Sequence, residues 1–157
     1  MKKKVIGLLC LLIIAMPLFA EMERAELQEM YLEFFRSRDI RAFIDPEGDI
    51  EFIYEGIYLD PTPFWITVYE SDQQFFQIVK YGGYTLDTVL ERSLAPIAAT
   101  IATRWAPVAK VFVNDGGNNI IATAEALLVS PGDFVAVFDR LMEGLEIALL
   151  IFLENMP

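Results

Sequence analysis

Three segments of this chain space their apolar residues as amphipathic helices do, with an apolar position at every third or fourth residue. They are residues 21–38, 85–106 and 134–153. In the second segment, Ser93 is placed to cap a helix that carries Pro96 in its first turn. Ile97, Ile101 and Trp105 then recur every four residues. We expect them to form the buried stripe of this helix.

The segments between these helices have the short apolar runs and turn residues of β-strands. We expect strands over residues 41–44, 50–54, 64–69, 75–81, 108–114 and 120–129. Pro61 and Pro63 cannot donate to a ladder, so the third strand is expected to begin near Phe64. Turns at 45–49 and 115–119 join hairpins. The order α-β-β-β-β-α-β-β-α predicts an α+β two-layer sandwich, an antiparallel sheet with helices on one face.

The first twenty residues have the layout of a secretory signal peptide. Three lysines precede an apolar run, and the small residue Ala20 stands before an acidic stretch. A retained anchor is the alternative, but the apolar segment 5–20 has about 16 residues, fewer than the roughly 20 that span a bilayer. We therefore expect cleavage of residues 1–20 and an exported protein, periplasmic or secreted. The remaining single domain, residues 21–157, should have no stable membrane span.

Composition narrows the chemistry of this domain. The chain contains no histidine, and its single cysteine, Cys10, lies within the predicted signal peptide. The domain therefore lacks the usual general base, the usual thiol nucleophile and the softer metal ligands. The acidic turn that begins at Asp45 does not match an EF-hand, because Ile50 and Gly56 stand where glycine and glutamate are required. We expect no enzyme activity, no bound metal and no cofactor.

Charge restricts the class of partner. The chain has 23 acidic and 12 basic residues, and its net charge is −11. Such a surface repels nucleic acid, so we expect the partner to be an unidentified protein or peptide. Lys80 and Lys110 are the only lysines beyond the predicted signal peptide, and both are expected on exposed strand faces.

Aromatic side chains form an apolar surplus on the strands. Trp65 and Tyr69 share one face of their strand, and Phe75 and Tyr81 share one face of the next. One face of the sheet must meet the helices, and the other keeps large aromatic side chains. The pattern predicts either an ordinary, partly buried sheet covering or a partner-binding surface made by these four residues.

The end of the last helix is apolar on all sides. Residues 147–153 contain no polar side chain over two turns, which a surface helix does not need. This segment is too short to span a membrane. It is therefore expected either to be buried on two sides by its own chain or to complete a homodimer. Leu150 and Leu153 join the candidate partner-binding residues on this ground.

Four local likenesses to one known family accompany the element order. The turn at residues 45–50 leads into Phe52 and Tyr54, residues 109–115 resemble the strand after the crossover helix, and residues 124–128 resemble the next strand. Residues 133–134 with Leu141 resemble the closing helix. In these features the chain resembles the YbjN-like domains over nearly all of its mature length. The resemblance implies the type III secretion chaperone-like fold and non-enzymatic roles in binding, chaperoning or regulating other proteins.

These patterns together predict an exported, non-enzymatic domain that binds a protein or peptide through an apolar and aromatic surface. Its role would be chaperone-like or regulatory. The alternative prediction is a small-molecule or lipid-binding module with an apolar pocket between the helices and the sheet.

Overall fold

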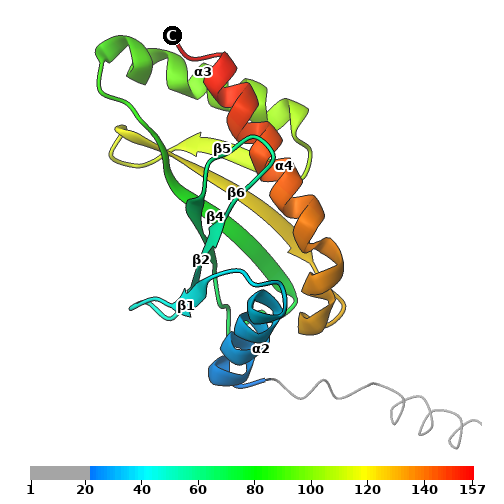
Figure 1. Cartoon of the computed structure of the whole chain (residues 1–157). Helices are drawn as coiled ribbons and strands as arrows, with labels where there is room; N and C mark the ends of the chain where they lie inside the picture. Colours follow the sequence, from blue (N-terminus) through cyan, green and yellow to red (C-terminus); the bar gives the residue numbers. More distant parts are fainter. Residues whose placement is uncertain (1–21) are drawn as a thin grey trace, which may run out of the picture.

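The computed structural model describes residues 22–157, and the predicted signal peptide lies outside the described residues. In chain order the elements are α2 (Arg24–Ser37), β1 (Ala42–Ile44), β2 (Ile50–Tyr54), β3 (Thr62–Ile66), β4 (Phe75–Thr85), α3 (Val89–Trp105), β5 (Ala109–Val113), β6 (Asn119–Leu127), the short 3-10 helix η1 (Pro131–Asp133) and α4 (Phe134–Glu154). Figure 1 shows the helices beside one sheet. This succession confirms the predicted element order and the α+β class.

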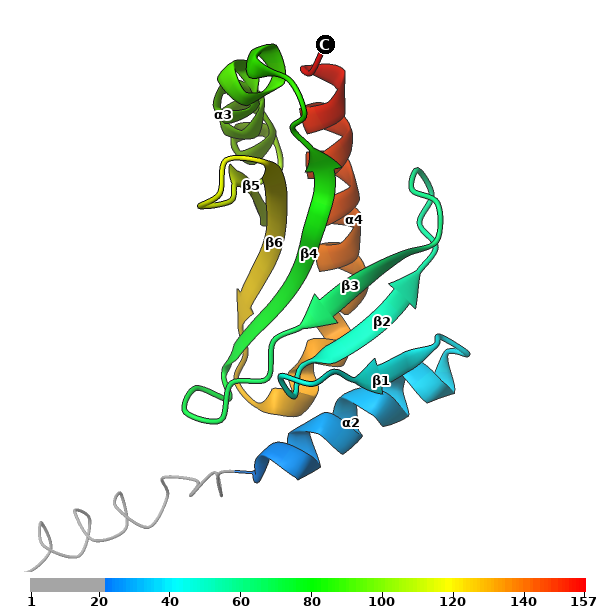
Figure 2. The ribbon, with the colours of Figure 1, turned by 90° about the vertical axis from the view of Figure 1, so that its left-hand side faces the viewer.

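The six strands form one open sheet in the order β1-β2-β3-β4-β6-β5, and every neighbouring pair is antiparallel. The buried side chains of Phe52, Ile78 and Val111 point to the face that the helices cover. β4 pairs with β6 along most of its length, whereas β3 pairs with β4 only at Trp65 and Ile66. The β2–β3 hairpin therefore diverges from β4, as Figure 2 shows.

The start of β3 differs from the prediction. The strand begins at Thr62 and includes Pro63, so the expected start near Phe64 was wrong. Pro63 stands opposite Ile53, whose N–H donates to the carbonyl of Arg41 on the other side of β2. The nitrogen of Pro63 accordingly points away from β2, toward the side where β4 has left the ladder. A proline is tolerated here because no strand needs its missing N–H.

Helix α3 begins one turn earlier than predicted. The hydroxyl of Thr88 accepts a hydrogen bond from the N–H of Glu91 at 3.1 Å, and the carboxylate of Glu91 accepts one from the N–H of Thr88 at 2.7 Å. This capping box, and not Ser93, starts the helix. Ser93 donates instead to the carbonyl of Val89 at 2.8 Å, and Pro96 lies inside the helix.

Phenylalanine rings fill the space between the helices and the sheet. The fully buried rings are those of Phe35, Phe52, Phe64, Phe76, Phe134, Phe138 and Phe152. Phe35 of α2 stacks on Phe52 of β2 with ring centroids 4.5 Å apart, and Phe34 meets Phe134 of α4 edge-on at 4.8 Å. Such pairs add about 0.5–1.5 kcal/mol beyond their apolar burial. The aromatic core therefore fixes α2 and α4 on the same face of the sheet.

The buried stripe of α3 is not the predicted one. Ile97 is 59% exposed and Trp105 is 66% exposed. The residues that this helix buries are small: Ala95, Ala98, Ala99 and Ala102. The loop after the helix lies so close to α4 that a Cβ added to Gly144 would be 2.3 Å from a methyl carbon of Val108. Alanines also recur at helical spacing, and these small residues let α3 pack closely on α4 and β5.

Lys80 lies on the helix-facing side of β4, so its predicted exposure was wrong. It is 8% exposed, and its ammonium lies 5.7 Å from the centroid of the Phe64 ring. Burial lowers the pKa of Lys80. Strand alternation explains the position, because Lys80 has the same parity as the buried Phe76 and Ile78. Lys110 is exposed, as expected.

Candidate partner-binding surface

Among residues 22–157, no helix packs on one face of the sheet, and we call this the helix-free face. Alternate residues of all six strands point to this face: Phe43, Glu51, Trp65, Phe75, Gln77, Val79, Tyr81, Lys110, Phe112, Ile121, Thr123, Glu125 and Leu127. Residues of neighbouring antiparallel strands stand opposite each other on this face. Trp65 stands opposite Val79, and Tyr81 stands opposite Ile121.

The four aromatic residues predicted from the strands lie together on the helix-free face. Trp65 and Tyr81 meet edge-on with centroids 5.2 Å apart, and Tyr69 and Phe75 do the same at 5.2 Å. Tyr81 is 45% exposed, while the other three are half-buried. Val79, which stands opposite Trp65, is only 3% exposed although it lies on the helix-free face. The aromatics thus form a thin second apolar layer that remains open to solvent.

Three further apolar side chains extend this layer. Phe43 of β1, Phe112 of β5 and Leu127 of β6 are all exposed. Strand pairing places two of these residues in line with the aromatics. Phe43 stands opposite Glu51, which stands opposite Trp65. Phe112 stands opposite Ile121, which stands opposite Tyr81. Strand alternation alone marks these residues in the sequence. Strand alternation does not tell which strands are neighbours, and the observed order of the strands in the sheet does.

A line of hydrogen bonds crosses the helix-free face next to the aromatics. The hydroxyl of Tyr69 donates to Gln77 at 2.9 Å, and the amide of Gln77 donates to Glu125 at 3.2 Å. The ammonium of Lys110 donates to the other oxygen of Glu125 at 2.5 Å. Burial raises the pKa of Glu125, but the hydrogen bonds from Lys110 and Gln77 outweigh it and hold this pKa below its usual value. The line links residues from three strands and fixes their side chains.

Carboxylates lie around the same rings. Burial raises the pKa of Tyr81, and the nearby charges of Asp49 and Asp45 raise it further. Burial also raises the pKa of Tyr69, and a hydrogen bond with Thr67 lowers it. The charges of Asp49 and Glu125 raise it further. These shifts place negative charge beside the aromatic layer. The surface is therefore aromatic and acidic.

The two predicted residues on α4 lie apart from this face. Leu150 is half-buried and Leu153 is exposed, both on the helix layer behind the sheet. Around them Ala148, Leu149 and Phe152 are buried by the sheet and α3. The six predicted residues thus divide into four on the helix-free face and two on the helix layer. Within residues 22–157, no helix combines the length and apolarity that a membrane span requires.

A second apolar surface lies on α3. We call it the α3 stripe, which consists of the exposed Leu90, Ile97 and Trp105 and the half-buried Leu94 and Ile101. Beside it, a groove of about 330 Å³ runs between α3 and the edge strand β5. The hydroxyl of Thr103 closes this edge, since it accepts from the N–H of Val111 at 2.9 Å and donates to its carbonyl at 3.2 Å. The middle of β5 is thereby protected from pairing with another strand.

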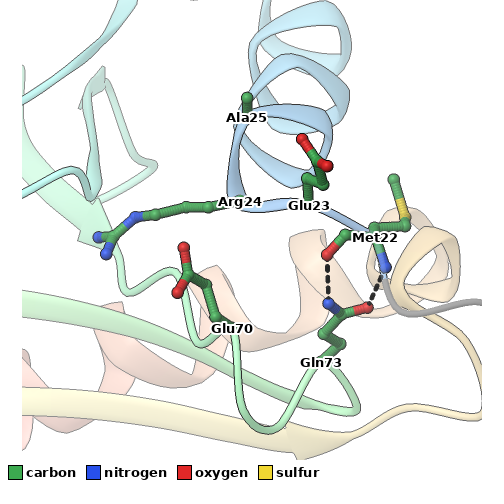
Figure 3. A pocket seen from close by; sticks show the side chains of 6 residues that line it. All are labelled: Met22, Glu23, Arg24, Ala25, Glu70 and Gln73. Carbon is green, nitrogen blue, oxygen red and sulfur yellow. Dashed lines mark hydrogen bonds between the residues drawn. The ribbon is translucent and has the colours of Figure 1, made fainter.

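The start of the described chain is tied to the loop before β4. Gln73 donates to the carbonyl of Met22 at 2.6 Å and accepts from its N–H at 3.0 Å, as Figure 3 shows. Glu23, Arg24 and Glu70 line the open pocket of about 500 Å³ beside this contact. The double hydrogen bond fixes the chain immediately before α2.

The described residues bring together no metal-binding cluster. Among residues 22–157, no group of three or more acidic side chains is arranged to hold a metal ion. The chemistry that the helix-free face offers is apolar contact, aromatic stacking and attraction of positive charge. These are means of binding.

Comparison with known proteins supports the fold. No family model matches the chain, and no curated protein matches it. Among solved structures, it is similar to a chain of the HopA1-SchA chaperone-effector complex, with a TM-score of 0.55 and 12% identity, over 85% of this chain and 98% of that one. An uncharacterized protein from Methanothermobacter thermautotrophicus is similar with a TM-score of 0.49 and 10% identity, over 83% and 99% of the two chains. The first likeness supports the chaperone-like fold expected from the sequence.

Proposed function

We propose that this protein binds another protein in a chaperone-like or regulatory role, and that the helix-free face is the binding surface. The observation that carries the proposal is a layer of aromatic side chains from four strands, β1, β3, β4 and β5, that no helix among residues 22–157 covers. Contact of this apolar area with water is unfavourable, so a partner that covers it gains free energy of binding. The likeness to a chain of a chaperone-effector complex supports the same reading.

The helix-free face is also preorganised for binding. Its aromatic rings are held by edge-on contacts, and the line from Tyr69 through Gln77 and Glu125 to Lys110 fixes the side chains between them. Side chains that are already ordered lose little conformational entropy when a partner binds. Aromatic residues at the centre with polar residues beside them are the usual composition of a protein interface.

An aggregation assay tests this proposal. The protein is mixed with reduced α-lactalbumin, and light scattering follows its aggregation. We expect the unchanged protein to lower the scattering and Tyr81→Asp to lose most of this effect, because a charge then replaces an exposed ring at the centre of the layer. Ala136→Asp, which adds the same charge at an exposed position of α4, is the matched control. Equal activity of both variants would exclude the helix-free face as the binding surface.

We further propose that the α3 stripe joins two copies of the chain. Ile97 and Trp105 are more exposed than buried, although large apolar side chains on α3 would be expected to face its neighbours. A symmetric contact along one helix covers the same residues on both copies. Ile97→Glu should shift the sedimentation coefficient from that of a dimer to that of a monomer. Ala136→Glu, exposed on α4 and outside the stripe, should leave it unchanged.

Export after removal of residues 1–20, a periplasmic or secreted location, the absence of enzyme activity and membership of the YbjN-like family are further parts of this proposal. The mass of the protein recovered outside the cytoplasm tests the first, since cleavage after Ala20 predicts a chain that begins at Glu21. The lipid-binding alternative predicts that native mass spectrometry finds a bound lipid. Recovery of lipid together with full activity of Tyr81→Asp would favour that alternative.

A further inference from the structure

One row of the helix-free face places a carboxylate between two aromatic side chains. Glu51 of β2 stands directly opposite Phe43 of β1 and directly opposite Trp65 of β3. Side chains at such directly opposed positions lie about 4.5–5.5 Å apart at their Cβ atoms. Phe43 is exposed, and Glu51 and Trp65 are half-buried. The three therefore present two rings and one negative charge side by side.

The carboxylate of Glu51 has no hydrogen bond or ion pair with any of the residues that the structure describes. Its neighbours on this face differ. Glu125 is bound by Lys110, and Asp49 accepts a hydrogen bond from the N–H of Val68 at 2.9 Å and lies 3.7 Å from the guanidinium of Arg24. Among residues 22–157, Glu51 is thus a carboxylate beside the aromatic layer that no other side chain binds.

The chain already contains the same combination of groups with an arginine bound to it. The guanidinium of Arg38 lies over the ring of Phe34 at 4.4 Å and near the ring of Phe138 at 5.8 Å. It also donates two hydrogen bonds to the carboxylate of Asp139, one of them at 3.2 Å. Two rings and one carboxylate together satisfy both the flat face and the donors of a guanidinium.

We propose that the row of Phe43, Glu51 and Trp65 binds an arginine side chain in a basic segment of the partner protein. This inference rests on the proposed function of the helix-free face and names the chemistry of its partner. The guanidinium stacks on the exposed ring of Phe43 and donates to Glu51. The net charge of −11 attracts basic segments to the protein and repels acidic ones.

Three labelled peptides of one length test the chemistry by fluorescence anisotropy with the full domain. One alternates arginine and leucine, the second replaces each arginine by uncharged citrulline, and the third replaces it by glutamate. We expect the arginine peptide to bind about three- to thirty-fold more tightly than the citrulline peptide, because one exposed ion pair and one stacked guanidinium contribute together. The glutamate peptide should bind least.

Two variants locate the arginine. Glu51→Gln and Phe43→Leu should each weaken binding of the arginine peptide by about two- to five-fold, the range of one exposed cation–π contact or ion pair. Neither should change binding of the citrulline peptide. Glu143→Gln, which removes the same charge from the exposed side of α4, is the matched control and should have no effect.

The outcomes separate the two proposals. Equal affinity for the arginine and citrulline peptides would overturn the arginine site and leave the apolar binding surface standing. An equal loss in Glu51→Gln and Glu143→Gln would also overturn it, since attraction would then depend on net charge alone. Binding of none of the peptides, together with an inactive aggregation assay, would refute the proposed function as well.

Discussion

Gly56 packs against a buried carboxylate, and its replacement offers a sharp test of the packing. Glu146 of α4 is 3% exposed, and one of its oxygens accepts a hydrogen bond from the N–H of Ile57 at 3.3 Å. The other oxygen has no hydrogen-bond partner among the described residues. A Cβ added at Gly56 would lie 1.2 Å from that oxygen. Gly56→Ala therefore requires that the β2–β3 loop or the carboxylate move.

The magnitude follows from what this movement breaks. A hydrogen bond to a charged group contributes about 1.5–3 kcal/mol, and the water that reaches the freed carboxylate recovers part of it. We expect Gly56→Ala to lower the free energy of unfolding by about 1–3 kcal/mol. For a domain of this size that is a fall in Tm of about 3 to 12 °C.

Thermal unfolding followed by circular dichroism measures the loss, and chymotrypsin reports on the loop. Tyr58 is exposed in the β2–β3 loop, and its cleavage should quicken when the loop leaves Glu146. Gly132→Ala is the matched control, because a Cβ at that position meets nothing within 4 Å. It should change neither Tm nor the cleavage rate.

A double-mutant cycle can refute the explanation. In a Glu146→Ala background the added methyl of Gly56→Ala finds free space, so its further effect on stability should be small. If the methyl destabilises the two backgrounds equally, the contact between Gly56 and Glu146 is not the cause. An unchanged Tm in the single variant would refute the packing itself.

Three further variants probe other parts of the fold. Ala102→Leu should lower the free energy of unfolding by about 1–3 kcal/mol in a urea titration, because Ala102 is fully buried on the packed face of α3. Thr103→Val removes both hydrogen bonds to Val111 and should lower it by about 1–3 kcal/mol, whereas Thr100→Val should not. The pKa of Glu125 in the folded state is below its usual value. Its contribution to the free energy of unfolding is therefore fully present above the pKa of the unfolded state, and it is lost as the pH falls through the pKa of the folded state. Glu125→Gln should therefore flatten the acid side of the stability profile.

Local patterns carried most of the fold prediction. The turn after Asp45 and the loop after Asn114 mark hairpins whatever lies around them, since short-range hydrogen bonds hold both. Strand alternation placed Trp65 and Tyr81 on one face before the neighbouring strands were known. Strand alternation also placed Lys80 on the same side as Phe76 and Ile78. Only the assumption that a lysine avoids the helix-facing side was wrong.

The sequence by itself determined the elements, their order and the residues that share each face, because these depend on periods of two and of 3.6 residues. Only the tertiary structure decided which face of α3 meets its neighbours and which strands bring Phe43, Glu51 and Trp65 into one row. Periodicity marks two apolar stripes on α3, and the distance to α4 selects the alanines. That distance is set by residues far away in the chain, so the exposure of Ile97 and Trp105 follows from packing and not from pattern.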